Sequence, residues 1–211
     1  IGLVGKYVEL QDSYKSILEA FIHSGAVNEV EIEVVSIHSE HISNKNYETL
    51  LDGLHGLLVA PGFGERGIEG KIKSVEYVRK NKIPFFGICL GMQMAVIEYS
   101  RNVLGLHGAN STEMTKDATY PVIDLMESQK KIKNKGGTMR LGSWKCSLSE
   151  NTLVYDIYGK SNISERHRHR YEFNNKFSKI IFSESFKPSG INPDTGLIEI
   201  IELKDHPWFI G

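Results

Sequence analysis

Short apolar runs alternate with longer amphipathic stretches through the first half of the chain. The runs have the length and character of strands, and the amphipathic stretches repeat their apolar residues at helical spacing. This order predicts an α/β domain with a mostly parallel sheet covered by helices on both faces. The predicted strands occupy residues 31–37, 57–59 and 84–88, and the predicted helices occupy residues 12–24, 67–80 and a stretch that starts after residue 89.

The first of these helices has recognisable boundaries. Asp12 is suited to the N-cap, and Gly25 stands where a helix commonly ends in the left-handed conformation. The stripe between them consists of Ile17, Leu18, Phe21 and Ile22.

The second half of the chain is less regular. Residues 120–125, 138–148 and 197–203 predict strands, and residues 152–158 predict a short helix. A Lys-rich segment at residues 129–137 has few apolar positions and predicts a surface loop, for which a solvated charge run is the simplest interpretation.

The most informative motif surrounds Cys89. It follows an apolar strand, precedes a helix, and has glycines two residues before and two residues after it, Gly87 and Gly91. This is the pattern of a nucleophile elbow, a turn too tight for a Cβ at either glycine. The turn places the sulfur at a helix N-terminus, where we expect a lowered thiol pKa. The alternative is a buried structural cysteine.

A second motif, residues 60–64 (APGFG), follows the predicted strand 57–59. The carboxyl ends of parallel strands share one edge of a sheet, so this loop is expected beside Cys89. The Gly62 N–H and the N–H of Leu90 could then bind the oxyanion that forms when sulfur attacks a carbonyl. Alone, the same residues would indicate only a turn.

Composition narrows the class of protein. The chain has 211 residues, 40% of them hydrophobic, which suits one domain with a full core. A formal net charge of −1 argues against nucleic acid or a membrane as the main partner. Two distant cysteines suggest neither a disulfide framework nor a zinc site, and a reducing cytoplasm is expected. The first and last residues both fall within strand patterns, so we expect a fragment of a longer protein.

Residues 87–93 (GICLGMQ), with residues 61–64 (PGFG) before them, resemble the class I (triad) glutamine amidotransferase domain. The resemblance runs from end to end. It implies a flavodoxin-like α/β fold of class I amidotransferase architecture, with residues 1–211 as a glutaminase domain truncated at both ends and the synthetase domain absent. Further blocks narrow it to the CTP synthase family: residues 4–8 (VGKYV), 64–71 (GERGIEGK), 108–113 (GANSTE), 136–142 (GGTMRLG), 166–172 (RHRHRYE) and 205–209 (DHPWF).

The resemblance implies a role for each matching residue. Cys89 matches the nucleophile, and Gly62 and Leu90 match the oxyanion-hole amides. Glu113 matches the carboxylate that holds the substrate α-amino group, and Arg170 matches a contact near the α-carboxylate. A zwitterionic amino acid independently requires one anion and one cation in its pocket. The segment that lines the glutamine pocket in the family matches Leu90, Gly91, Met92 and Gln93.

A lid linked to allosteric activation by GTP is also implied, at the Lys-rich segment and the residues after it. Thr138 and Arg140 are its candidate residues. Residues 136–137 would form a hinge, and Arg140 could face nucleotide phosphates. His167 and His169 have a spacing that metal ligands can show, but three arginines flank them, so no metal site is predicted.

One departure from the family concerns the catalytic base. The family takes it from a His-Pro-Glu motif on the strand after the Trp-Phe pair, which would lie beyond residue 211. His206 is followed by Pro207 and Trp208, a non-catalytic feature in the family, so His206 is not assigned to the triad. We therefore expect the stretch 1–211 to be inactive alone.

The resemblance implies that this domain hydrolyses L-glutamine through a Cys thioester and needs no cofactor of its own. The ammonia would serve the ATP-dependent amination of UTP to CTP by the N-terminal synthetase domain, with Mg²⁺, in a cytoplasmic homotetramer activated by GTP. Two alternatives remain at this point: a non-catalytic amidotransferase-like regulatory or binding module, and another Cys-elbow hydrolase of flavodoxin-like fold.

Overall fold

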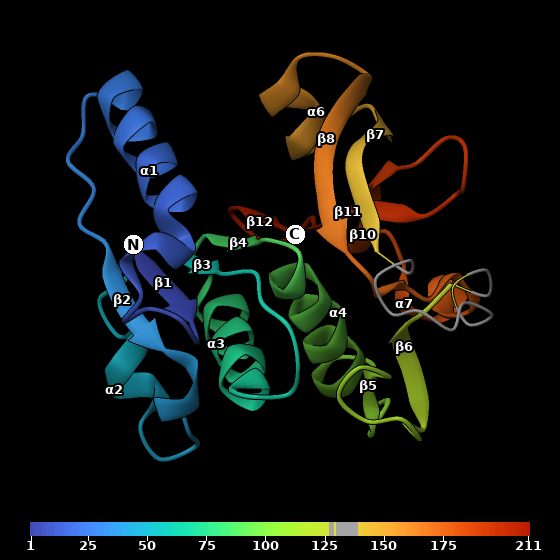
Figure 1. Cartoon of the computed structure of the whole chain (residues 1–211), viewed down its shortest axis with the longest axis horizontal. Helices are drawn as coiled ribbons and strands as arrows, with labels where there is room; N and C mark the ends of the chain where they lie inside the picture. The colour runs from blue at the N-terminus through green and yellow to red at the C-terminus, as the bar shows by residue number, and fades with distance from the viewer. Residues whose placement is uncertain (127–128, 130–138) are drawn as a thin grey trace.

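A computed structural model of the chain describes residues 1–126, 129 and 139–211 (Figure 1). The main feature of these described residues is a nine-stranded sheet. In spatial order the strands are β2 (Val35–His38), β1 (Gly2–Gly5), β3 (Leu57–Val59), β4 (Phe85–Gly87), β12 (Phe209–Ile210), β11 (Ile198–Leu203), β10 (Phe186–Ile191), β7 (Arg140–Leu148) and β8 (Asn162–His169).

The sheet has a parallel half and an antiparallel half. From β2 to β12 each neighbouring pair is parallel, and from β12 to β8 each pair is antiparallel. The parallel half confirms the expected α/β fold. The antiparallel half extends the same sheet past β12, and β8 at its edge was not predicted as a strand.

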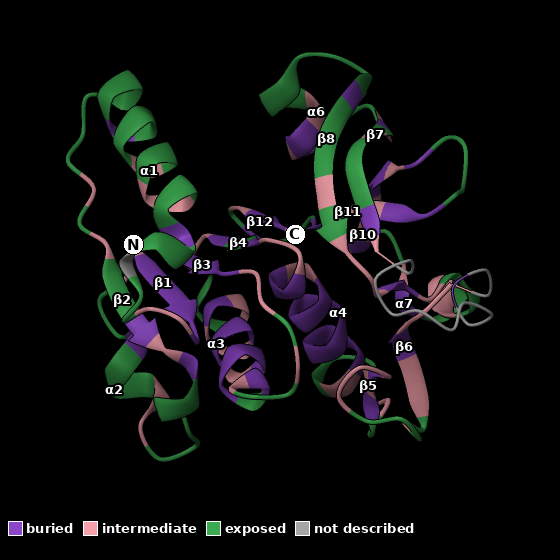
Figure 2. Ribbon diagram, viewed as in Figure 1, coloured by how far each residue is buried: buried purple, intermediate pink, exposed green. Residues whose placement is uncertain are grey.

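Helices cover both faces of the parallel half. Leu3 and Leu58 belong to the apolar cluster packed against α1 (Lys15–Asn28). Val4 and Val59, the next residues along the same strands, belong to the cluster formed with α3 (Ile68–Asn81) and α4 (Leu90–Asn102). Alternating side chains of a strand point to opposite faces, so each strand is buried on both sides. In Figure 2 most of α4 is buried, whereas most of α1 is exposed.

Shorter elements complete the fold. A second, three-stranded sheet lies beside α4 (Figure 1), and the last of its strands comes shortly after β8 in the chain. These elements are β5 (Ala109–Ser111), β6 (Tyr120–Asp124), β9 (Glu172–Phe173), α2 (Tyr47–Leu51), α6 (Leu153–Tyr158), α7 (Ser178–Ile181), and the 3-10 turns η1 (Gln11–Tyr14), η2 (Ser39–His41) and η4 (Asn175–Phe177).

The predicted boundaries of the first helix were wrong. Asp12 lies in η1, and α1 begins at Lys15 with no side-chain cap. Gly25 does not end the helix, which continues to Asn28. A Cβ on Gly25 would lie 2.7 Å from the Val30 carbonyl oxygen, so glycine is needed there because the returning chain passes close to it.

Among the helices that the structure describes, none has both the length and the apolar character that crossing a membrane requires.

Candidate active site

Cys89 lies in the turn between β4 and α4, as the nucleophile-elbow pattern predicts. Its backbone has φ 55° and ψ −102°, in the positive-φ region that non-glycine residues rarely adopt. Such a conformation costs about 1–3 kcal/mol and persists only where its surroundings enforce it. Hydrogen bonds on both sides do so: Ile88 N–H donates to Val59 O at 3.1 Å, and Gln93 N–H donates to Cys89 O at 3.2 Å.

The two glycines that flank Cys89 are sterically required. A Cβ on Gly87 would lie 2.7 Å from the backbone carbon of Gly91, and a Cβ on Gly91 would lie 2.3 Å from Val59 O. Contacts this short with backbone atoms cannot be relieved by a side-chain rotation. The close approach of α4 to β3 and β4 therefore depends on these two residues.

The charge environment of Cys89 differs from the sequence-based expectation. The pKa of the thiol is raised to about 11, chiefly by burial and in addition by the carboxylates of Glu172 and Glu113. A hydrogen bond from the Leu90 backbone and the nearby Lys71 ammonium act in the opposite direction but are outweighed. The prediction of a lowered pKa was wrong because it considered only the helix N-terminus. The thiolate at this site needs a base to form near neutral pH.

The loop 60–64 after β3 lies against the elbow. A Cβ on Gly62 would be 3.4 Å from Leu90 Cδ2, so the two predicted oxyanion-hole residues are neighbours. Three side chains hold the loop. Lys71 Nζ donates to Ala60 O at 2.8 Å, Lys6 Nζ donates to Phe63 O, and Glu113 Oε1 accepts from Gly64 N–H at 2.8 Å.

The first turn of α4 supplies the other predicted pocket residues. Met92 and Gln93 line the cleft together with Gly62 and Cys89. Leu90 and Gly91 are buried beneath it, where their backbone forms the elbow. Gln93 Nε2 donates to Tyr171 O at 3.0 Å, and Gln93 Oε1 is buried with no hydrogen-bond partner among the described residues.

Glu113 and Arg170 approach the elbow from different segments. Glu113 follows β5 and binds the loop 60–64, and its charge acts on Cys89. Arg170 follows β8 and immediately precedes Tyr171, whose carbonyl accepts the Gln93 hydrogen bond. The structure thus brings Glu113 to the elbow directly and Arg170 to the chain beside it.

Arg140 is not available to a nucleotide. Its side chain is 3% exposed and pairs with Glu199 at 2.7 Å and with Glu172 at 3.2 Å, while its guanidinium lies over the ring of Trp144. The expectation that Arg140 faces nucleotide phosphates is therefore corrected: it is a buried ion-pair residue. Thr138 and the Lys-rich segment, apart from Gln129, lie outside the described residues.

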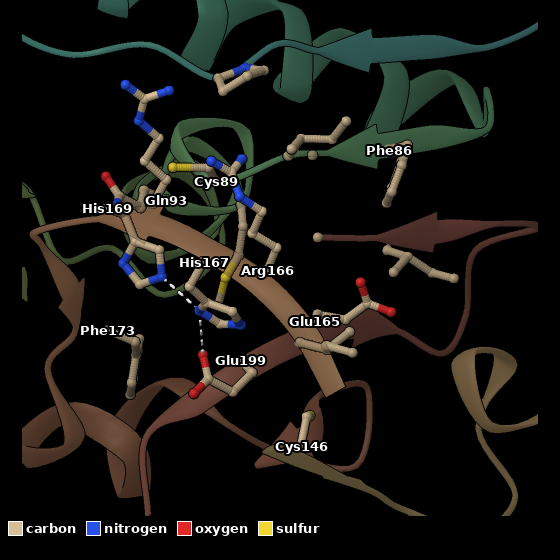
Figure 3. Close-up of a pocket in the computed structure, with 18 of the residues that line it drawn as sticks. Phe86, Cys89, Gln93, Cys146, Glu165, Arg166, His167, His169, Phe173 and Glu199 are labelled. Carbon is tan, nitrogen blue, oxygen red and sulfur yellow. Dashed lines mark hydrogen bonds and ion pairs between the residues drawn. The ribbon is translucent and has the colours of Figure 1, made fainter. Parts of the chain in front are cut away.

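Two histidines extend the same polar network. His167 Nδ1 lies 2.8 Å from His169 Nε2 and 3.6 Å from Glu199 Oε2, as the dashed lines in Figure 3 show. Ligand atoms of these three residues lie within 4.8 Å of one another, a separation that metal sites also show. Both oxygens of Glu199, however, already accept from Arg140. The guanidinium already balances the charge of this carboxylate, so the network is better described as an ion-pair cluster.

The elbow and this network border one cleft of about 970 Å³. In Figure 3, Cys89 and Gln93 lie together on the side formed by α4, with His167, His169 and Glu199 across the cleft on β8 and β11. Cys146 is also among its lining residues, but it is only 2% exposed and packs with Val154 and Ile163. Cys89 is the more accessible thiol.

His206 is far from the nucleophile along the sheet. It precedes β12, and Phe209 pairs with Phe85 at the start of β4, whereas Cys89 follows the end of β4. Its ring nitrogens lie 3.1 Å from Val78 O and 3.2 Å from Trp208 O. This position agrees with leaving His206 out of the triad.

Four charged residues were not singled out from the sequence: Lys6 and Lys71, which hold the loop 60–64, and Glu172 and Glu199, which line the cleft. Of these four, only Lys71 has a feature in the sequence that could have identified it. It follows Ile68 by three residues and precedes Ile72, so it falls on the apolar stripe of its helix, where a charged side chain is unusual.

Comparison with known sequences is informative over the whole chain. The family model described as glutamine amidotransferase class-I matches residues 9–211. The CTP synthase of Flavobacterium johnsoniae is 67% identical over 211 residues, and that of Clostridium acetobutylicum is 57% identical over 211 residues. Each match covers 100% of this chain and 39% of the relative, so the chain spans about two fifths of the length of these relatives.

Solved structures agree with the fold. The Trypanosoma brucei CTPS glutaminase domain with bound acivicin is similar to this chain with a TM-score of 0.91 and 33% identity, over 99% of this chain and 82% of that one. A glutamine amidotransferase from Thermotoga maritima has a TM-score of 0.57 at 11% identity, over 100% of this chain and 72% of that one, and shares the fold alone.

Proposed function

Because this chain belongs to the class I glutamine amidotransferase family, we propose that it is the glutaminase domain of a CTP synthase and hydrolyses L-glutamine at Cys89. The observation that carries the proposal is the elbow itself. A cysteine held at positive φ between Gly87 and Gly91 faces a glycine loop that a carboxylate, Glu113, already holds. An inert core cysteine does not require this strain.

The reaction follows from these groups. The Cys89 thiolate attacks the side-chain amide carbon of glutamine, and the carbonyl oxygen becomes an oxyanion that the Gly62 and Leu90 N–H groups bind. The C–N bond then breaks, the leaving nitrogen takes a proton, and ammonia departs from a γ-glutamyl thioester. Water hydrolyses the thioester to glutamate and regenerates the thiol.

Substrate orientation is proposed for the charged pair. Glu113 would hold the α-ammonium group, and Arg170 would hold the α-carboxylate. Met92 and the buried Oε1 of Gln93 lie at the same turn, where the substrate side chain must pass to reach the sulfur. An acid and an arginine together suit a free amino acid better than a peptide.

The base is proposed to come from the residues that follow β12 in the full-length protein. The thiol pKa of about 11 makes a base necessary. β12 runs parallel to β4 with Ile210 beside Phe86, so the chain leaving β12 heads toward the edge where Cys89 lies.

The activity of the whole protein is also a proposal, since the chain spans 39% of its CTP synthase relatives. We propose that ammonia passes to an N-terminal synthetase domain, which would bind ATP, Mg²⁺ and UTP and form CTP. GTP activation, a homotetramer and a cytoplasmic location belong to the same proposal. The glutaminase domain itself would need no cofactor.

The assignment of Cys89 can be tested by covalent labelling of the full-length protein. A diazoketone analogue of glutamine should add once to Cys89 and abolish glutamine-dependent synthesis, while ammonia-dependent synthesis continues. Intact-mass and peptide analysis locate the adduct. Cys89→Ala should take up no label, and Cys146→Ala is the matched control that should label normally. Labelling at Cys146 would overturn the assignment.

A further inference from the structure

Lys71 is the most unusual charged residue of the described chain. It projects from the first turn of α3 into the core and is 0% exposed. Lysine is almost never fully buried without a charged partner, because removing the ammonium from water is costly. A residue of this kind behind a loop that borders the cleft calls for a functional explanation.

The contacts of Lys71 are few and directed at one loop. Its Nζ donates to Ala60 O at 2.8 Å and lies 3.6 Å from the position that a Cβ on Gly62 would take, the same distance as Lys6 Cε. No carboxylate among the described residues forms an ion pair with it. The ammonium therefore lies directly behind the glycine whose N–H is proposed to bind the oxyanion.

The charges around the site explain why a cation belongs there. Glu113 and Glu172 both act on Cys89 and oppose formation of the thiolate, whereas Lys71 favours it. The influence is mutual. The pKa of Lys71 is lowered to about 7, because burial and the Lys6 ammonium lower it by more than a charged Cys89 raises it. The two groups are thus electrostatically coupled, and each stabilises the charged form of the other.

We propose that Lys71 is a positioning residue of the glutaminase site, which fixes the loop 60–64 through Ala60 and provides the buried positive charge that stabilises the Cys89 thiolate and the oxyanion. This role rests on the proposed function. Lys71 touches neither the substrate nor the sulfur by a hydrogen bond, so it acts through the backbone of the loop and through its charge at short range.

The geometry also separates Lys71 from Lys6. Lys6 donates to Phe63 O, three residues further along the same loop, and is 6% exposed. Lys71 holds the carbonyl that precedes Pro61, next to the elbow. The two lysines together fix both ends of the loop, but only the charge of Lys71 acts on Cys89.

The test compares variants in the full-length protein. Lys71→Met removes the charge and the hydrogen bond at similar volume. We expect the kcat for glutamine hydrolysis to fall at least about tenfold, with a smaller change in KM and an unchanged ammonia-dependent rate. The pH at which Cys89 alkylation becomes fast should be higher than in the wild type, because a thiol without a neighbouring cation has a higher pKa.

A second variant separates positioning from charge. Lys71→Gln keeps an N–H donor without the charge, so it should share the pH shift while losing less kcat if the contact with Ala60 is retained. Lys80→Met, on the same helix and 59% exposed, is the control and should match the wild type. If the Lys71 variants only destabilised the fold, the melting temperature and the ammonia-dependent rate would fall together with kcat.

The outcomes distinguish this inference from the proposed function. A wild-type kcat and alkylation profile in Lys71→Met, or loss of folding in both variants, would overturn the role of Lys71 and leave Cys89 catalysis intact. Glutamine hydrolysis that survives Cys89→Ala would overturn the proposed function itself.

Discussion

The backbone at Cys89 is kept in a strained conformation by its neighbours, and the same neighbours decide its reactivity. Gly87 and Gly91 permit the turn, while Glu113, Glu172 and Lys71 set the charge around the sulfur. Burial and the two carboxylates raise the thiol pKa by more than the single ammonium lowers it, so the resting thiol is protonated near neutral pH. A nucleophile of this kind reacts only once substrate and base are in place, which limits wasteful modification of the free thiol.

Glu113 offers a test with a defined sign. Glu113→Gln keeps an oxygen that can accept from Gly64 N–H but removes the charge. A substrate ammonium left without its anion loses about 1.5–3 kcal/mol, so KM for glutamine should rise about tenfold or more, with ammonia-dependent synthesis unchanged. Steady-state kinetics with both nitrogen sources measure this.

The same variant should make Cys89 easier to alkylate, because the Glu113 carboxylate is one of the charges that raise the thiol pKa. The shift is opposite in direction to that of Lys71→Met. Glu69→Gln, at a carboxylate whose side chain is 76% exposed, is the control. An equal loss of ammonia-dependent synthesis in Glu113→Gln would show that Glu113 is structural and does not bind substrate.

Among the elements, the stability of the antiparallel pair β7–β8 depends on the ion pairs of Arg140. Arg140→Met leaves the buried carboxylates of Glu172 and Glu199 without their cation, and breaking a buried pair in this way costs about 3–5 kcal/mol. The free energy of unfolding from chemical denaturation should fall by that amount.

Lys145→Met on the same strand is the matched control. Lys145 is 71% exposed and its contact with Asp194 spans 3.5 Å, so its loss should cost less than about 1 kcal/mol. Equal, small effects for both variants would mean that the buried ion pairs of Arg140 contribute little to stability.

Elements marked by a continuous apolar run or by an apolar stripe at helical spacing were predictable. Residues 57–59 form β3 as expected, and the predicted helix 67–80 is α3, Ile68–Asn81. β8 was missed because its exposed Arg166 and Arg168 alternate with half-buried histidines, so no apolar periodicity marks the strand. Gly25 was wrongly predicted to end the helix because, in the sequence alone, a glycine needed for a close chain contact cannot be told from a glycine that ends a helix.

The site divides in the same way. The proximity of Cys89, Gly62 and Leu90 was predictable, because tight turns place these residues and tight turns leave glycine patterns in the sequence. Glu172 and its effect on Cys89 were not, because these two residues lie more than 80 residues apart in sequence. Pairings at that range leave no periodic signal in a single chain.

At the scale of the molecule, the two-residue strand β12 joins the parallel and antiparallel halves of the sheet. Phe209 pairs with Phe85 in β4, its ring lies 4.3 Å from that of Phe85, and it is 1% exposed. Phe209→Ala should destabilise the protein by about 3–5 kcal/mol. Amide hydrogen exchange should accelerate in β1, β3 and β4 and in β10 and β11 alike.

Phe86→Ala, next to the same junction but at a side chain that is 39% exposed, is the control and should cost clearly less. Faster exchange confined to one half in Phe209→Ala would show that the halves unfold as separate units and that β12 does not couple them.

The place of β12 has a consequence for biosynthesis. It is the last strand of the described chain, yet it lies in the middle of the sheet, between β4 and β11. While the ribosome is still adding these residues, the strands on either side have already emerged, and each presents an unpaired edge at the centre of the future sheet. Such edges readily pair with the wrong strand or with another nascent chain. The interval before β12 emerges is therefore the period when this domain most needs protection by chaperones, and slow translation just ahead of residue 209 would lengthen it.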